Sequence, residues 1–339
     1  MFGNTQEFGG DLLATVHEEF GKARSATIAS GYVSHDIINE FEPDFVRLAE
    51  EQEGFRLLIG MAFYEGLSQK MLTKLETVHH QLSDVSGGKS GVYVAYNRRF
   101  HGKIYSFQNG GGNHVYLGSS NFSRSGLQGN LECTAQVLDH KTQSDVESYL
   151  DFLFNRERAV EIIKADITVP GSKEYKRRLS LTTLDDLQKY DPTTINPSLF
   201  PHFELPLSRI VEHEKSNLNV YFGKGRWARS SGKVTPRPWY EAELIAVREI
   251  NSHPLYPHGN FLAYTDDGYI IPMSTQGDYH KNIRSKGSLS IFGQWIKGKL
   301  QRTNALIPLT PVTQDTLDIY GNDTLKFYKM AEGKYYLEF

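Results

Sequence analysis

The first half of the chain alternates short, apolar, β-rich runs with longer amphipathic segments, and this alternation limits the possible folds more than any other feature. Residues 26–33 and 55–61 have the length and composition of buried strands, and residues 35–52 and 67–83 have the period of helices. Alternating strands and helices predict an α/β layer fold with a mixed sheet. After Gly87 we expect strands at 92–96, 103–107, 114–118 and 132–138, followed by a helix at 142–155.

The second half has a different texture, with short aromatic and β-branched runs broken by Gly, Pro and Asp-Asp-Gly turns. Closely spaced strands of this kind predict a mainly β barrel or pseudobarrel. We therefore expect a first domain at 1–160, a linker at 161–200 and a β domain at 201–339. In the β domain we expect strands at 218–222, 240–250, 261–265 and 268–272, and a helix at 289–300.

The composition of the chain excludes several classes of protein. Cys133 is the only cysteine, which excludes an intramolecular disulfide framework and a multi-cysteine zinc site and leaves His and carboxylate groups as the possible metal ligands. No stretch approaches the roughly 18 to 20 uninterrupted apolar residues of a membrane-spanning helix, and residues 1–11 lack the layout of a secretory signal. We expect a cytoplasmic protein that does not associate with membranes.

The net charge of −3 hides an uneven distribution of charge. Residues 215–302 carry 13 Lys and Arg against 6 Asp and Glu, a local charge of +7, whereas the rest of the chain carries 24 against 34, or −10. A basic segment inside an acidic protein indicates an anionic ligand. Nucleic acid is the leading candidate.

One stretch has the residues of a phosphoryl-transfer site. His101 and Lys103 are two residues apart on a predicted strand and project from the same face, as do Ser119 and Asn121 if strand geometry persists there. An imidazole nucleophile, an ammonium group, a hydroxyl and an amide together suit the transfer of a phosphoryl group. Glu132, entering the next strand, is placed to hydrogen-bond the imidazole Nδ1–H and fix its tautomer.

The order His-x-Lys, then Gly-Ser-Ser-Asn, resembles the signature of the phospholipase D superfamily. The resemblance implies that His101 attacks phosphorus, that a second His protonates the leaving oxygen, and that no metal is needed. The family's Asp is Gln108 here, and Glu132 is our candidate to replace it. Because the only other His-x-Lys, at 213–215, lacks a phosphate-holding turn, we expect a homodimer that pairs two His101 side chains.

Two segments of the basic half resemble DNA-binding arms, because cations there alternate with aromatic, amide and carboxylate groups. The first arm is expected to be loop-like because it contains Gly223, Gly225 and Gly232. The residues expected to contact DNA are Lys224, Arg226, Trp227, Arg229, Lys233 and Arg237 in the first arm, and Asp278, Tyr279, His280, Lys281, Asn282, Arg284 and Lys286 in the second.

A phosphodiesterase domain followed by a β DNA-reading domain resembles the NgoFVII-type (BfiI-like) restriction endonucleases, whose second domain is a plant B3-like pseudobarrel. The resemblance implies a bacterial, metal-independent endonuclease that cleaves double-stranded DNA as a homodimer. In some relatives a helicase-like partner translocates on DNA, and such a partner would bring its own requirement for ATP and magnesium. This chain has no complete phosphate-binding loop of its own, because Gly88-Lys89-Ser90 lacks the upstream glycine.

Two alternatives stay open at this stage. One is a lipid or other phosphodiesterase of the phospholipase D superfamily, and the other is a DNA-binding protein whose catalytic motif is vestigial. A choline-release assay would identify the first, and specific binding without nicking would identify the second.

Overall fold

The computed structural model describes residues 1–50, 53–173, 175, 179, 184–208 and 217–339. The described chain forms two compact units, one made of residues 1–170 with 225–236 and the other of residues 171–224 with 237–339. The first unit is an α/β layer structure and the second is mainly β, so the predicted fold class is confirmed. None of the described helices has the length and apolar character needed to cross a membrane.

The first unit is built on a seven-stranded mixed sheet in the order β6-β5-β4-β1-β2-β3-β7. β1, β2 and β3 run parallel, and the flanking strands pair in the antiparallel direction. The strands are β1 (Ser25–Ser30), β2 (Phe55–Ile59), β3 (Gly91–Ala95), β4 (Lys103–Asn109), β5 (Gly112–Gly118), β6 (Thr134–Val137) and β7 (Ala159–Glu161). The helices are α1 (Leu12–Lys22), α2 (His35–Glu50), α3 (Ala62–Glu65), α4 (Gln69–Ser86) and α5 (His140–Leu153).

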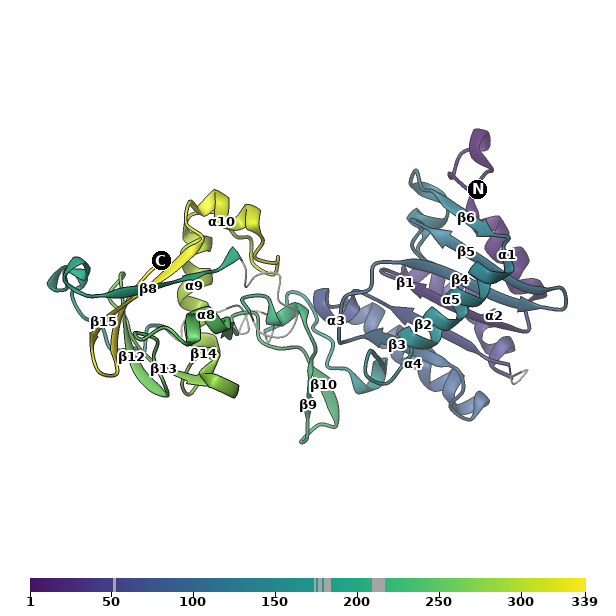
Figure 1. The fold of residues 1–339 in the computed structure, drawn as a ribbon. Coiled ribbons are helices and arrows are strands. Elements are labelled where there is room, and N and C mark those ends of the chain that lie inside the picture. The colour runs from purple at the N-terminus through teal and green to yellow at the C-terminus, as the bar shows by residue number, and fades with distance from the viewer. Residues whose placement is uncertain (51–52, 174, 176–178, 180–183, 209–216) are drawn as a thin grey trace. The chain divides into compact units, whose positions relative to one another are not determined.

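Helices cover both faces of this sheet (Figure 1). On one face, Val146, Leu150 and Leu153 of α5 pack on the buried side chains of Ala29 and Ile104. On the other face, aromatic rings fill the space between helices and sheet. The ring of Phe45 in α2 stacks on that of Phe55, with the centroids 4.0 Å apart, and the ring of Phe20 in α1 stands edge-on to that of Phe107, with the centroids 5.1 Å apart. Burial of apolar side chains on both faces makes the sheet a rigid support for groups placed at its edge.

The second unit contains another seven-stranded sheet, in the order β11-β14-β13-β12-β16-β15-β8. Its strands are β8 (His202–Pro206), β11 (Leu244–Ile245), β12 (Asn260–Thr265), β13 (Ile270–Gln276), β14 (Asn282–Ser285), β15 (Thr324–Ala331) and β16 (Lys334–Glu338). Its helices are α8 (Arg248–Asn251), α9 (Ser290–Arg302) and α10 (Gln314–Tyr320). Phe292 and Trp295 of α9 are fully buried and share a core with Phe327 and Leu337 of the sheet.

Two of the predicted strands are wrong. Residues 218–222 contain a 3-10 turn, η7 (Val220–Phe222), and of residues 240–250 only Leu244–Ile245 is strand. The side chain of Asn219 bonds both the N–H and the C=O of Val312, at 2.8 and 2.7 Å. This long-range anchor draws the apolar run into a turn, against its strand propensity.

Candidate active site and nucleic-acid interface

The predicted catalytic residues gather at one edge of the first sheet. β1 and β5 end at this edge, and β4 and β6 begin there, as the pairs Ser30–Lys103 and Gly118–Thr134 show. His101 lies two residues before β4, and Ser119 directly follows β5. Strand pairing therefore brings His101, Lys103, Ser119 and the residues near Glu132 together from separate parts of the sequence.

His101 and Lys103 form the centre of this cluster. The His101 side chain is exposed, whereas only 6% of the Lys103 surface is accessible. The Lys103 Nζ lies 3.1 Å from His101 Nδ1 and also donates to the His101 carbonyl oxygen. Burial lowers the pKa of Lys103, while the nearby Glu132 carboxylate acts in the opposite direction. A poorly solvated ammonium beside an exposed imidazole suits an anionic substrate.

Asn121 is oriented by the end of β1. Its Oδ1 accepts hydrogen bonds from the Tyr32 N–H at 3.2 Å and from the Ser30 hydroxyl at 3.4 Å. With Oδ1 directed at the protein, the Asn121 Nδ2 has no hydrogen-bond partner among the residues that the structure describes. An amide donor without a protein partner is suited to hold a phosphate oxygen.

Glu132 contacts Ser119 instead of the imidazole. The Ser119 hydroxyl donates to the Glu132 carboxylate and accepts from the Cys133 N–H at 2.9 Å. Asn130 Nδ2 lies 3.5 Å from the other Glu132 oxygen. Within the described part of the chain, no hydrogen bond joins Glu132 to His101. The predicted role of Glu132 in fixing the His101 tautomer remains a prediction, and in this structure the carboxylate acts on Ser119 and, by its charge, on Lys103.

The structure adds three residues that the sequence reasoning missed, Ser30, Gly31 and Tyr32. A side chain at Gly31 would lie 3.4 Å from His101 Cδ2 and 3.5 Å from Asn121 Oδ1, so glycine leaves room for both. The Tyr32 ring stands edge-on to the His101 ring, with centroids 5.8 Å apart. All three lie in the last part of the strand predicted at 26–33, and the carboxyl end of that strand was the available signal.

Gln108 lies away from the cluster. It sits near the far end of β4, paired with Ser25 and Asn113, whereas His101 and Lys103 lie at the start of that strand. Its departure from the family's Asp therefore falls outside the catalytic edge. The second His-x-Lys, at 213–215, lies outside the described residues.

The first predicted arm is a β-hairpin and not a loop. β9 (Arg226–Ala228) pairs with β10 (Lys233–Thr235), and Trp227 remains 53% exposed. The hairpin is fastened within the first unit, where the Gly225 N–H donates to the Tyr96 carbonyl and the Val234 carbonyl accepts from the Asp166 N–H at 2.7 Å. A side chain at Gly225 would lie 2.5 Å from the Phe63 ring, so this close approach requires glycine.

The second predicted arm surrounds a 3-10 turn, η8 (Asp278–His280), and continues into β14. Tyr279 is 85% exposed, and Tyr279 and His280 both have left-handed backbone angles, with φ of 55° and 57°. The Tyr256 hydroxyl donates to the His280 carbonyl at 2.7 Å and braces the turn. A conformation that is unfavourable for two bulky residues keeps the Tyr279 ring in solvent.

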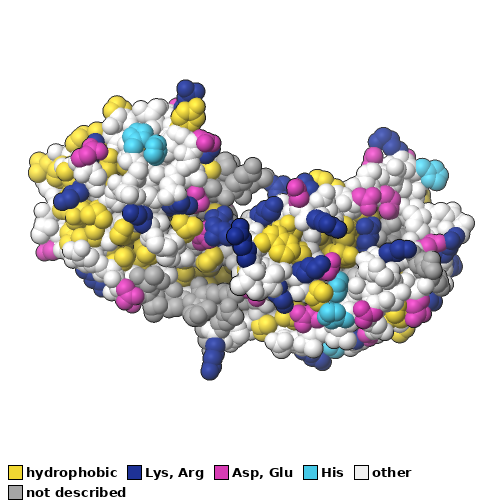
Figure 2. Space-filling model, turned by 90° about the horizontal axis from the view of Figure 1, so that it is seen from below, with side chains coloured by type: hydrophobic (Ala, Val, Ile, Leu, Met, Phe, Trp, Pro, Cys, Tyr) yellow, Lys and Arg dark blue, Asp and Glu magenta, His cyan; other side chains and the backbone are white. Residues whose placement is uncertain are grey.

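The remaining predicted DNA contacts differ in accessibility. Lys224 and Lys286 are exposed, whereas Arg237 is an internal ion-pair partner of Glu241 at 2.6 Å. Both of these paired side chains are almost inaccessible, at 10% and 2%. On the face that Figure 2 shows, Lys and Arg side chains are interspersed with Asp and Glu and do not form one continuous basic surface.

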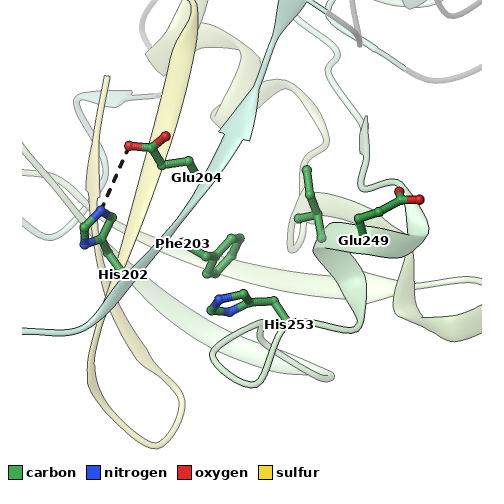
Figure 3. A pocket seen from close by; sticks show the side chains of 6 residues that line it. His202, Phe203, Glu204, Glu249 and His253 are labelled. Atoms are coloured by element: carbon green, nitrogen blue, oxygen red, sulfur yellow. Dashed lines mark ion pairs between the residues drawn. The ribbon is translucent and has the colours of Figure 1, made fainter.

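One pocket of about 250 Å³ lies in the second unit, between β8 and α8. Figure 3 shows His202 and Glu204 on one side and Glu249 on the other, with the His253 ring beside Phe203. Two carboxylates make the pocket unsuitable for a phosphate, and it contains none of the predicted site residues. Among the described residues, no group of three or more His, Cys, Asp or Glu side chains is arranged to hold a metal ion.

Comparison with solved structures gives three proteins with low similarity. The polyphosphate kinase from Porphyromonas gingivalis is 16% identical, with a TM-score of 0.31 over 44% of this chain and 22% of that one. NucT from Helicobacter pylori is 16% identical, with a TM-score of 0.34, and Nuc, a phospholipase D family member from Salmonella typhimurium, is 14% identical, with a TM-score of 0.32. Each of these two matches covers 44% of this chain and 90% of the other. No curated protein matches the sequence.

Two family models match, and together they account for both halves of the chain. Residues 11–167 match the N-terminal phospholipase D (PLD) domain of the NgoFVII restriction endonucleases, and residues 196–331 match the NgoFVII C-terminal B3-like DNA-binding domain. The first match contains the edge cluster, and the second contains both predicted arms. The lipid phosphodiesterase is thereby set aside, and the chain belongs to the NgoFVII family of restriction endonucleases, with a PLD-family nuclease domain and a B3-like domain that binds DNA.

Proposed function

We propose that this endonuclease cleaves DNA through a phosphohistidine formed on His101, in an active site that two copies of the chain complete. The observation that carries the proposal is the exposed His101 imidazole with the buried Lys103 ammonium 3.1 Å from its Nδ1. We propose Nε2 as the attacking nitrogen, so the reactive imidazole carries its proton on Nδ1, and the Lys103 ammonium turns from Nδ1 to the phosphate. Lys103, Ser119 and the amide of Asn121 stabilise the negative charge on the non-bridging oxygens.

The reaction takes place in two displacements. His101 Nε2 attacks phosphorus and forms a P–N bond, while the P–O bond to the leaving nucleoside oxygen breaks. That oxygen takes a proton from the His101 of the second copy. This second imidazole then accepts a proton from water, which attacks the phosphohistidine, breaks the P–N bond and releases the phosphorylated DNA end. Neither displacement requires a catalytic metal ion.

Exposed apolar side chains support the presence of a second copy beside the active site. Leu131, next to Glu132, is 84% exposed. Phe8 is 57% exposed and belongs to the segment that pairs with β6 through the Phe2–Thr134 bridge. Covering these side chains in a symmetric interface would remove apolar surface from water and pair the two His101 rings.

Cys133 offers a direct test of the dimer. It is exposed and is the only cysteine in the chain, so a short bis-maleimide can join two copies only through this residue. We expect a cross-linked dimer in the wild type and little in Leu131→Asp, which should also lose cleavage. A fully active monomer in sedimentation would contradict the joint active site.

For DNA recognition we propose the exposed residues of the hairpin and of the 278–286 segment, with Trp227 and Tyr279 as stacking or base-edge contacts. Arg237 is left out of this set because its guanidinium is occupied by Glu241. A bacterial cytoplasmic location suits an enzyme that meets incoming DNA. A helicase-like partner would add a requirement for ATP and magnesium, which cleavage assays with and without ATP can detect.

The decisive experiment is His101→Ala in the full-length protein. We expect plasmid cleavage to disappear while binding of a specific duplex is unchanged, and wild-type cleavage to persist in EDTA. Trapping a ³²P-labelled protein from labelled DNA at acid-quenched early times tests the covalent step. Cleavage by His101→Ala at the wild-type rate would refute the assignment. Specific binding without nicking by the wild type would favour a vestigial site.

A further inference from the structure

Both the nitrogen and the oxygen of the Asn4 side-chain amide form hydrogen bonds to main-chain groups. Its Nδ2 donates to the Gly126 carbonyl at 3.0 Å and to the Asn130 carbonyl at 2.9 Å, and its Oδ1 accepts from the Leu12 N–H at 3.3 Å. Asn4 therefore ties the first turn of α1 to both ends of one surface loop, η2 (Ser125–Gly129), a π-helical turn that Asn130 ends. The residue lies outside the range 11–167 that matches the family model.

The loop held by Asn4 connects the two sides of the catalytic edge. At its start, Gly126 packs so closely on Asn121 that a side chain there would lie 2.4 Å from the Asn121 carbonyl oxygen. The Ser123 hydroxyl accepts from the Gly126 N–H at 3.1 Å, and the Ser123 N–H donates to the Asn121 carbonyl at 2.7 Å. At its end, Asn130 leads to Glu132, which receives the Ser119 hydroxyl.

The segment around Asn4 is itself fixed in place. Phe2 and Thr134 exchange two backbone hydrogen bonds, of 2.7 and 3.0 Å, which extend the sheet beyond β6. Thr5 and Gly10 close the segment through another bridge. Asn4 adopts a left-handed φ of 55°, which asparagine tolerates better than most residues. This combination orients one amide side chain toward the loop.

We propose that Asn4 is a positioning residue that sets the distance between Asn121 and Glu132 at the active site, so that residues 1–10 are a working part of the nuclease domain. The inference rests on the proposed function of that site. Without the amide, the two carbonyl groups of the loop lose their donors and are left to water. The loop then relaxes, and the Glu132 carboxylate moves relative to Ser119 and Lys103.

The test compares Asn4→Ala and Asn4→Asp with Gln6→Ala, a control in the same segment at an exposed side chain for which the described structure has no hydrogen bond. We expect single-turnover cleavage to fall by about 10- to 100-fold in Asn4→Ala, with an unchanged dissociation constant for specific DNA and only a small decrease in melting temperature, since alanine is less favourable at a left-handed φ. Asn4→Asp should be worse, because its carboxylate faces two carbonyl oxygens. Gln6→Ala should behave as wild type.

Two readouts separate positioning from simple loss of stability. The double variant Asn4→Ala with Glu132→Gln should lose less cleavage rate than the product of the fold-losses of the two single variants, because both substitutions act on the same carboxylate. The alkaline limb of the cleavage rate should also move to lower pH in Asn4→Ala, because Glu132 then supports the pKa of Lys103 less. A wild-type cleavage rate in Asn4→Ala would overturn this inference. A loss of cleavage rate that is fully explained by a lower melting temperature would also overturn it. The covalent mechanism would fail only if His101→Ala still cleaves.

Discussion

The two regions to which we assign catalysis and DNA recognition hold their candidate side chains in opposite ways. At the catalytic edge, Lys103 is almost fully buried and Ser119, Asn121 and Glu132 are fixed by hydrogen bonds to neighbouring groups. In the recognition segments, Trp227 and Tyr279 project into solvent, and it is the backbone beneath them that is braced. Chemistry on one phosphate needs fixed atoms, whereas recognition of a duplex needs accessible ones.

This difference predicts that the largest functional effect comes from the buried ammonium. Lys103→Met keeps the length of the side chain but removes its charge, and one lost transition-state donor costs on the order of 10²- to 10³-fold in rate. We expect that loss in single-turnover cleavage, with DNA affinity nearly unchanged. The matched control is Lys70→Met, at an exposed lysine of α4, which should cleave normally. Equal losses of affinity and rate in Lys103→Met would place this lysine in DNA binding instead.

A second prediction concerns stability, because the recognition unit contains a buried lysine without an evident role in binding. Lys297 is fully inaccessible, donates to the Trp239 carbonyl and lies over the Trp239 ring at 4.0 Å. Burial lowers its pKa from 10.5 to about 7, with Glu241 opposing the shift. Replacing a buried ion pair by apolar side chains of similar volume is often neutral or stabilises a protein by about 1–4 kcal/mol, and we expect the same direction for this buried charge.

The sign of the pH dependence follows from the protons that Lys297 binds in the folded and in the unfolded chain. Between pH 7 and 10.5 the unfolded chain keeps the Lys297 proton that the folded chain has lost, so the free energy of unfolding rises with pH in that window. We expect Lys297→Met to be more stable than wild type at pH 7 and below, with the difference vanishing toward pH 10.5. Chemical denaturation across this range measures it, and Lys334→Met is the exposed control. A pH-independent difference would mean that the pKa of Lys297 is the same in the folded and the unfolded chain, against the lowered pKa.

The sequence predicted the catalytic edge better than the recognition segments, for a physical reason. His101, Lys103, Ser119 and Asn121 lie on or beside adjacent antiparallel strands, β4 and β5, whose short connection makes their proximity foreseeable. The contributions of Gly31 and Tyr32 depend on the pairing of β1 with β4, which are far apart in the sequence. Local patterns do not specify such long-range pairings.

The second unit shows where pattern reasoning fails. β8, β15 and β16 were not predicted, although Phe203 and Leu205 of β8 alternate with exposed residues in the manner of a half-buried strand. In the first unit, the basic hairpin was likewise expected to be a loop, because of its glycines. Gly225 instead allows close packing on Phe63, and Gly232 adopts the left-handed conformation with φ of 64° near the hairpin's turn. A glycine in the sequence can serve close packing or a left-handed backbone conformation, and only the tertiary contacts distinguish the two.

The smallest predicted effect belongs to two cations of the hairpin, the exposed Arg229 and the half-buried Lys233. Replacing Arg229 and Lys233 together by Ala removes two candidate phosphate contacts, each of which contributes about 0.9 to the slope of log K against log salt. We expect the slope to flatten by up to about 2, with a loss of affinity that is similar for specific and unrelated duplexes, and with single-turnover cleavage of bound DNA unchanged. Fluorescence anisotropy at several salt concentrations measures the slope. Lys70→Ala with Lys89→Ala, at exposed lysines of the nuclease unit, provides a control of equal charge. A loss confined to the specific duplex would instead make these side chains base contacts, because phosphate contacts weaken binding to all sequences alike.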